Sequence, residues 1–287
     1  MFLLLKMTRI KKHIHIIFSL LIFAFLIFFS YHPQSSKAAL PSGLVVGYSF
    51  DEGSGTVAFD INGTYNGTVL GATWVAGKYG GGLSFNGTSN SVSIGPQPAD
   101  VKPYTLTTWV KSNSLDGYVI SKRNDGQTGY WRISLNLNGS LLWLRDTSGA
   151  SGITVSTTVG LVPINTWTHI ALTWDGTVNA TSTRVYVNSI DVTGYQGAGQ
   201  GEVISDLGNN LTIGSRNGVS AFFSGTIDEP RIYNRVLSSS EITTDMNTPT
   251  DGIAPSAPGM FSSTAASSNI INLSWPASTD NVLVNEY

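Results

Sequence analysis

Short apolar runs alternate with Gly, Asn and Asp turn signals from residue 43 to about residue 235, and no helical period appears between them. Runs of this length with alternating apolar and polar positions are typical of β-strands. A series of about a dozen strands without covering helices favours a two-layer sandwich or a barrel. The pattern therefore predicts one all-β domain over residues 43–247. Besides the pairs discussed next, the predicted strands are 68–75, 91–94, 104–111, 118–122, 153–158 and 210–215.

Two strand pairs are explicit in the pattern. In residues 130–145, Trp131, Ile133, Leu135 and Leu137 alternate with polar residues. The Asn-Gly dipeptide at 138–139 then predicts a two-residue type I′ turn and a return strand. The second pair is 167–174 with 184–188. Its first strand is apolar on both faces, which predicts a position in the middle of a sheet.

The last strand of the domain, within residues 223–237, contains a proline. Because Pro230 cannot donate to a neighbouring strand, it belongs on an edge strand or at a bulge. Ile227 and Ile232 fall on opposite faces of a regular strand, and a bulge near Glu229 and Pro230 would bring both into the core. Residues 238–241, Ser-Ser-Ser-Glu, then predict a capped helical turn.

The two ends of the chain differ from the β-rich centre. Residues 1–38 combine Lys and Arg, an apolar stretch and a small-x-small motif, which predicts a cleaved secretory signal peptide. The alternative is a retained membrane anchor, for which the apolar stretch is about the minimum length. Residues 248–258 are rich in Pro, Gly and Thr and predict a linker. Residues 259–287 contain a further predicted strand pair with its own tryptophan.

The amino-acid composition and net charge exclude several classes of function. The formal net charge is −2, and no cluster of Lys and Arg occurs beyond residue 12, which excludes a phosphate-binding nucleic-acid module. The chain has no cysteine, so disulfides, thiolate catalysis and zinc–thiolate sites are excluded. Charged residues are only 12% of a chain rich in Gly and aromatics, which suits a β-sandwich working outside the cell. The cysteine-free composition favours a bacterial origin, and after signal cleavage we expect no membrane segment.

A fixed series of motifs runs through the predicted β domain. Its members include Tyr48-Ser-Phe-Asp-Glu-Gly-Ser-Gly-Thr56, Leu83-Ser-Phe-Asn-Gly87, Trp167-Thr-His169, Trp174-Asp-Gly176, Tyr186-Val-Asn188 and Gly225-Thr-Ile-Asp-Glu-Pro-Arg-Ile-Tyr-Asn-Arg235. The series resembles the laminin G-like domains of the concanavalin A-like lectin/glucanase superfamily. The resemblance implies a two-sheet jelly-roll sandwich, frequent binding of glycan or protein, and often a bound calcium ion.

A second resemblance concerns the C-terminal residues. Ala254-Pro-Ser-Ala-Pro258 and Ile271-Asn-Leu-Ser-Trp275 resemble the start of a fibronectin type III domain. A complete domain of that kind needs about 90 residues, comparable to an immunoglobulin sandwich. We therefore expect residues 259–287 to be a truncated β-sandwich and the chain to be a fragment of a longer protein.

Catalysis has little support in the sequence. A retaining glycosidase needs two carboxyl groups about 5 Å apart, and alternate positions on a strand would supply them. The chain has only five Glu, and none heads a Glu-x-Asp-x-x-Glu pattern. Asp228 and Glu229 are adjacent, so they point to opposite faces of a regular strand. His169, in a predicted strand, is interpreted as structural. We therefore predict no catalytic residues in the region present.

Calcium is the chemical hypothesis that the residues favour. This ion takes six to eight oxygens from carboxylates, carbonyls and amides, and the loop from Asp60 to Gly67 is rich in oxygen and glycine. The resemblance implies Asp60 and Asp228 as ligands, and Asn62 lies in the same loop. If the first and last strands are neighbours, Asp60 and Asp228 could hold one ion. The alternative is that both aspartates accept backbone hydrogen bonds. Asp51 is a weaker candidate.

The sequence thus predicts a secreted or cell-surface module without catalysis that binds an extracellular carbohydrate or surface protein. The alternatives are an adhesion or spacer module without a glycan site, and the accessory region of a glycoside hydrolase. No ligand-binding residue can be assigned from the pattern. The candidate aromatics are Tyr118, Tyr130, Trp143, Tyr195 and Phe222, and residues 191–200 are predicted to be a flexible loop.

Overall fold

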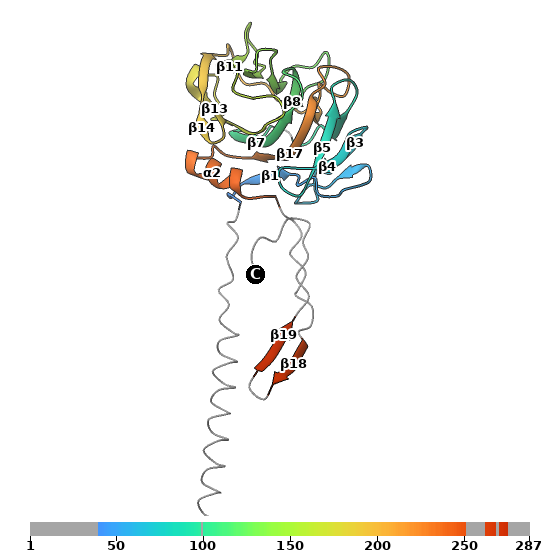
Figure 1. Ribbon diagram of the computed structural model, residues 1–287. Helices are drawn as coiled ribbons and strands as arrows, with labels where there is room; N and C mark the ends of the chain where they lie inside the picture. Colours follow the sequence, from blue (N-terminus) through green and yellow to red (C-terminus); the bar gives the residue numbers. More distant parts are fainter. Residues whose placement is uncertain (1–39, 99, 251–261, 268–269, 275–287) are drawn as a thin grey trace, which may run out of the picture. The chain divides into compact units, whose positions relative to one another are not determined.

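The computed structural model describes residues 40–98, 100–250, 262–267 and 270–274 (Figure 1). The predicted signal peptide at 1–38 lies outside these residues, as does most of the predicted linker. Among the described residues no helix is both long enough and apolar enough to cross a bilayer.

The β domain consists of two antiparallel sheets. Sheet A has eight strands in the order β14-β13-β12-β7-β17-β5-β4, with β1 also paired to β17. It contains β1 (Leu44–Gly47), β4 (Thr73–Ala76), β5 (Gly81–Asn86), β7 (Tyr104–Ser112), β12 (Trp167–Trp174), β13 (Thr183–Val187), β14 (Ile190–Asp191) and β17 (Ser224–Tyr233). The first and last strands of the domain are neighbours, since β1 pairs with β17. The strand at 167–174 is central, as predicted.

Sheet B has nine strands in the order β15-β11-β10-β9-β8-β16-β6-β3-β2. It contains β2 (Val57–Ala58), β3 (Gly67–Leu70), β6 (Ser91–Gly95), β8 (Gly117–Lys122), β9 (Trp131–Leu135), β10 (Leu141–Arg145), β11 (Ile153–Thr157), β15 (Thr193–Gly197) and β16 (Leu211–Ile213). The single predicted strand 68–75 is two strands, β3 and β4, in different sheets. Gly71 lies between them with a φ of 74°, where the chain leaves one sheet for the other.

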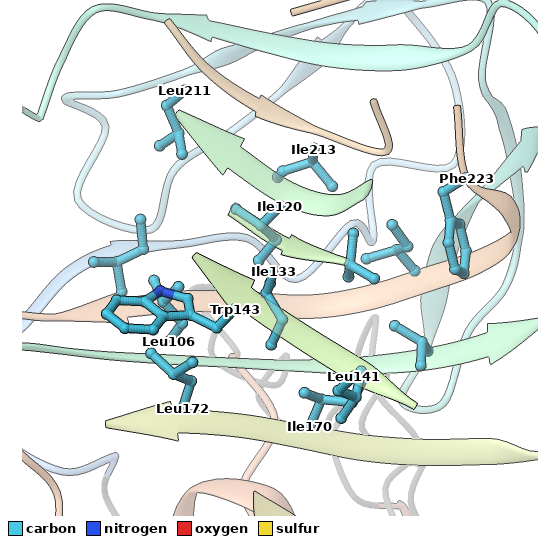
Figure 2. Packing of buried hydrophobic residues seen from close by; sticks show 14 of the residues in the cluster. Leu106, Ile120, Ile133, Leu141, Trp143, Ile170, Leu172, Leu211, Ile213 and Phe223 are labelled. Atoms are coloured by element: carbon cyan, nitrogen blue, oxygen red, sulfur yellow. The ribbon is translucent and has the colours of Figure 1, made fainter. Parts of the chain in front are cut away.

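The hydrophobic core lies between the two sheets (Figure 2). Leu106 of β7 and Leu172 of β12 approach it from sheet A, while Ile133 of β9, Trp143 of β10 and Ile213 of β16 approach it from sheet B. Each of these side chains is at most 2% exposed. Burial of an aliphatic side chain of this size contributes roughly 1.5–3 kcal/mol, so the sandwich is held by its core, as its lack of disulfides requires.

Strand β17 carries the bulge that Pro230 predicts. Its register against β7 shifts between Asp228 and Arg231, and Glu229 has a φ of 57°. The strand is nonetheless internal, with β7 on one side and β5 and β1 on the other, so the edge-strand alternative is wrong. The bulge inserts one residue, and Ile227 and Ile232 both enter the core.

The β9–β10 hairpin is confirmed, but its predicted turn is wrong. Asn136 N–H donates to the Ser140 carbonyl at 2.9 Å, so the loop has three residues rather than two. Only Gly139 in it adopts a positive φ, of 73°, which matches a three-residue loop closed by a left-handed residue. Leu137 consequently lies in the loop and is 80% exposed instead of continuing the strand.

Helix α2 (Ser239–Asn247) follows β17 and lies beside β1 and β17 in Figure 1. Ser238 accepts from the Glu241 N–H, and the Glu241 side chain accepts from the Ser238 N–H, which confirms the predicted cap. A short 3-10 turn, η1 (Ala180–Ser182), precedes β13. In the C-terminal region β18 (Ser262–Ser267) and β19 (Ile270–Ser274) pair antiparallel. This pair alone does not support the expected fibronectin type III domain, and the remainder of residues 259–287 lies outside the described residues.

Candidate functional site

The side chains of sheet B that point away from the core form one continuous surface, which we call the sheet B outer face. Register places Tyr118 opposite Ser134, Leu142 opposite Ser134 and Ser156, and Tyr195 opposite Ser156. Neighbouring strands are about 4.8 Å apart, so this row from β8 to β15 spans about 19 Å. The sheet B outer face is defined by Tyr118, Arg123, Tyr130, Arg132, Leu142, Leu144, Ser156 and Tyr195.

Tyr195 is the most exposed aromatic side chain of this face. It is 67% exposed. A Cβ atom built on Gly197 would lie 3.0 Å from the Tyr195 hydroxyl and 3.3 Å from its ring. The ring therefore lies along the strand over Gly197, because glycine leaves that space free. Most of the ring surface nevertheless remains exposed to solvent, and an exposed aromatic ring supported by the sheet is suited to stacking on an apolar ligand surface.

Two arginines cover the other tyrosines of the face. The Arg132 guanidinium lies 4.8 Å from the Tyr118 ring centroid, and its Nη1 donates to the Tyr118 hydroxyl at 2.7 Å. The Arg123 guanidinium lies 3.9 Å from the Tyr130 ring centroid. Cations at these distances are attracted to the ring face. Tyr118 and Tyr130 thus serve as supports for charged groups at one end of the face, whereas Tyr195 is open at the other.

The remaining aromatic candidates from the sequence do not belong to this face. Trp143 is 1% exposed in the core and donates its indole N–H to the Tyr104 hydroxyl at 3.2 Å. Phe222 is half-buried and lies just before β17 rather than on β8–β11 or β15. The stretch 191–200 is also more regular than predicted, because β15 occupies 193–197 and pairs with β11.

Asp60, one of the predicted calcium ligands, is buried among backbone donors. Its Oδ1 accepts from Gly47 N–H at 3.0 Å, and its Oδ2 accepts from the N–H groups of Thr64 and Tyr65 at 3.2 and 3.3 Å. Asn62 instead donates its side-chain amide to the Val45 carbonyl at 3.3 Å. These contacts match the alternative interpretation of Asp60, in which the carboxylate organises its own loop and ties it to β1.

Asp228, the other predicted carboxylate ligand, has one unsatisfied oxygen. It is fully buried, and its Oδ2 accepts from the N–H groups of Lys78 and Tyr79 at 2.7 and 3.0 Å. Its Oδ1 has no hydrogen-bond partner within the part of the chain that the structure describes. Burial first, and the charge of Glu229 second, raise the pKa of Asp228 to about 8. The site therefore favours either a proton or a cation at Oδ1.

The carboxylate that accompanies Asp228 is Asp51 rather than Asp60. Asp51 accepts from the Gly81 N–H, and its charge adds to the upward shift of the Asp228 pKa. A Cβ atom on Gly77 would lie 2.6 Å from Asp228 Oδ2, so the turn at 77–81 approaches both residues closely only because it is built from glycine. Among the described residues no group of three or more His, Cys, Asp or Glu side chains is arranged to hold a metal ion.

A buried ionic cluster, which sequence reasoning missed, joins β17 and β12 to helix α2. Arg231 is 1% exposed and pairs with Glu229 and, at 2.8 Å, with Asp245 of α2. His169 of β12 lies 3.4 Å from Asp245 through its Nε2, and the Tyr233 hydroxyl donates to the same carboxylate. His169 is 1% exposed, and burial lowers its pKa against the opposing effect of Asp245. This arrangement agrees with the structural role predicted for it.

A second buried cluster closes the core beneath the sheet B outer face. Asp206 accepts from Lys122 at 2.8 Å, from Arg145 at 3.0 Å and from the Trp131 indole at 3.1 Å. The Lys122 ammonium also donates to the Pro98 carbonyl at 2.5 Å. Burial opposes ionisation of Asp206, but the hydrogen bond and charge of Lys122 and the charge of Arg145 outweigh it and lower the pKa of Asp206. The cluster fixes the inward side of β8, which carries Tyr118, and of β9, which carries Arg132 and begins directly after Tyr130.

Comparison with known proteins agrees with this architecture. The family described as "Concanavalin A-like lectin/glucanases superfamily" (Laminin_G_3) matches residues 86–243, which is more than half of the 287 residues. The chain belongs to this superfamily. No curated protein sequence matches it. Laminin G-like domains are typically binding modules, and some members of the superfamily are enzymes.

Several solved structures share the fold. Domain 4 of AbnA, a GH43 extracellular arabinanase from Geobacillus stearothermophilus in complex with arabinotriose, superposes with a TM-score of 0.54 at 22% identity, covering 70% of this chain and 97% of that one. The binding domain of Paraclostridial Mosquitocidal Protein 1 gives 0.55 at 19% identity, covering 70% and 51%. Trypanosoma rangeli sialidase in complex with sialic acid gives 0.53 at 22% identity, covering 72% and 33%. At these identities the likeness concerns the fold.

Proposed function

We propose that residues 43–247 form a secreted, non-catalytic module that binds carbohydrate on the sheet B outer face. The observation that carries this proposal is Tyr195, whose exposed ring lies next to Gly197 on the same row as Tyr118. Sugar rings have apolar faces that stack on aromatic rings, and a rigid ring makes such a contact without a large loss of side-chain freedom.

The lack of acidic residues in four strands of sheet B supports binding rather than hydrolysis. Strands β8, β9, β10 and β11 contain neither Asp nor Glu, whereas a glycosidase requires a pair of carboxyl groups flanking the bond that it cleaves. Among the fold relatives, domain 4 of the extracellular arabinanase was solved with arabinotriose, and it is nearly matched in length by the domain described here. This likeness also supports export, which residues 1–38 would direct as a signal peptide.

The test is a glycan array followed by calorimetric titration with the purified protein. We expect saturable binding of at least one oligosaccharide, and a loss of affinity of tenfold or more in Tyr195→Ala. Ile190→Ala is the matched control, because Ile190 is equally exposed, at 67%, but belongs to β14 of sheet A. An intact fold with no bound glycan would refute the proposal in favour of an adhesion or spacer module. Equal losses in the two variants would remove Tyr195 from the site.

We also propose a structural calcium ion at Asp228, for which the unpaired, buried Oδ1 is the supporting observation. Asp228 would supply a carboxylate oxygen, with Asp51 close by, and a calcium ion would supply the positive charge that the buried carboxylate lacks. We do not assign Asp60 and Asn62 to this ion, because the Asp60 oxygens accept three backbone hydrogen bonds and the Asn62 amide donates to the Val45 carbonyl.

Thermal melting with and without a chelator tests the ion. We expect calcium to raise the melting temperature of the wild-type protein but not that of Asp228→Asn. Asp60→Asn should be destabilised to the same extent with calcium and with chelator, because its bonds are to backbone N–H groups. A wild-type melting temperature that is independent of calcium would refute the proposed calcium site.

A further inference from the structure

Two arginines of the domain have no acidic partner. Among the seven arginines of the described residues, five have a carboxylate oxygen within 4.0 Å; these are Arg145, Arg184, Arg216, Arg231 and Arg235. Arg123 and Arg132 have none in this part of the chain, and both lie on the sheet B outer face. The two guanidinium groups without a carboxylate partner therefore lie on the same face of the domain, beside Tyr118 and Tyr130.

Both guanidinium groups are held rather than free to move. Arg123 lies over Tyr130 at 3.9 Å, and Arg132 lies over Tyr118 at 4.8 Å with a hydrogen bond to its hydroxyl. Each side chain is half-buried, and its Nε–H has no hydrogen-bond partner within the described residues. A guanidinium fixed in this way offers a planar fork of donors at low cost in conformational entropy, and such a fork matches a carboxylate.

Acidic groups near the face do not cancel this charge. Asp146 follows β10 beside Tyr130, and its Oδ2 accepts from the Gly129 N–H at 2.9 Å. Asp125 pairs with Arg216. Neither of these two carboxylates pairs with Arg123 or Arg132 among the described residues.

We infer that the sheet B outer face binds an acidic oligosaccharide, with a sugar carboxylate at Arg123 and Arg132 and a sugar ring on Tyr195. This inference rests on the proposed carbohydrate-binding function and specifies its ligand class. The distance of about 19 Å between β8 and β15 requires a chain of several sugar units rather than a monosaccharide. A neutral glycan would leave both guanidinium groups without a carboxylate partner.

The test compares oligogalacturonate with its methyl ester, which has the same backbone but no charge, and includes dextran sulfate and arabinan. We expect calorimetry to show binding of an acidic chain at least tenfold tighter than that of any neutral one. Arg132→Ala and Arg123→Ala should each lose tenfold or more in affinity for the acidic chain. Arg184→Ala is the control, because that arginine lies on β13 of sheet A and is 46% exposed. Raising the salt concentration should weaken the acidic complex alone.

The outcomes separate this inference from the proposed function. Binding of a neutral glycan that equals or exceeds that of every acidic one, and that survives both arginine substitutions, would refute the acidic class and keep the carbohydrate module. No binding to any glycan by a folded protein would refute both. Preference for dextran sulfate, which has sulfate groups but no carboxylate, over oligogalacturonate, lost in Arg132→Ala, would keep the anionic site but overturn the carboxylate as its ligand. Arg132→Lys should retain only part of the affinity, because lysine keeps the charge but not the fork.

Discussion

Replacement of Arg231 by methionine tests whether the buried ionic cluster holds helix α2 to the sandwich. The Arg231 guanidinium pairs with the carboxylates of Glu229 and Asp245 and also donates to the Thr248 carbonyl and the Thr250 hydroxyl. Methionine fills a similar volume but leaves both carboxylates buried without a counter-charge. Breaking a buried pair in this way costs about 3–5 kcal/mol.

The expected change in melting temperature follows from the size of the domain. For a domain of roughly 150–250 residues, 1 kcal/mol corresponds to about 2–4 °C, so Arg231→Met should melt about 6–20 °C below the wild type. Urea unfolding followed by circular dichroism gives the free energy directly. The loss should be smaller in the triple variant that also carries Glu229→Gln and Asp245→Asn, because that variant leaves no buried charge behind.

Arg235→Met is the matched control for this prediction. Arg235 also pairs with α2, through Glu241 at 2.6 Å, but these two side chains are 31% and 36% exposed. An exposed pair is worth at most about 1 kcal/mol. If Arg231→Met lost no more stability than Arg235→Met, the argument that burial makes the Arg231 contacts strong would be refuted.

Two further predictions concern buried carboxylates. Because the folded-state pKa of Asp228 is raised to about 8 from 3.8, its contribution to stability falls as pH rises from about 4 to about 8. In chelator the melting temperature of the wild type should therefore decrease relative to that of Asp228→Asn over this range, and a constant difference would contradict the assignment. Asp206→Asn should lose about 3–5 kcal/mol in urea unfolding, because Lys122 and Arg145 then lack their counter-charge. The pKa of Asp206 is lowered, so its contribution is present above the unfolded pKa and is lost in acid, and the variant should approach the wild type as the pH falls below about 4.

Much of the fold could be predicted because it depends on local signals. The alternation of apolar and polar residues predicted the paired strands, and Ser238 and Glu241 predicted the start of α2. The odd spacing between Ile227 and Ile232 predicted the bulge at Pro230. The β9–β10 turn was less accurate, since Asn-Gly permits a type I′ turn but does not require one. The actual loop depends on where the two strands enter register, which the dipeptide does not specify.

The sites were harder to predict because their partners are distant in the chain. Asp228 accepts hydrogen bonds from residues about 150 positions away, at Lys78 and Tyr79, and Asp206 joins strands that lie 61 to 84 positions from it. The sequence presents Trp143 and Tyr195 as comparable aromatic candidates. Their roles diverge because Trp143 faces the opposing sheet, whereas Tyr195 faces solvent.

The sequence by itself determined the all-β class, the family, the closing strand with its bulge and the cap of α2. These features follow from side-chain periodicity, proline's missing donor and short-range hydrogen bonds. Only the tertiary structure decided that Asp60 accepts hydrogen bonds within its own loop and that, among the described residues, Asp228 keeps an unpaired oxygen and Arg123 and Arg132 lack acidic partners. Strand order and register decide which side chains meet across long separations, and the resulting burial and charge balance cannot be read from local pattern alone.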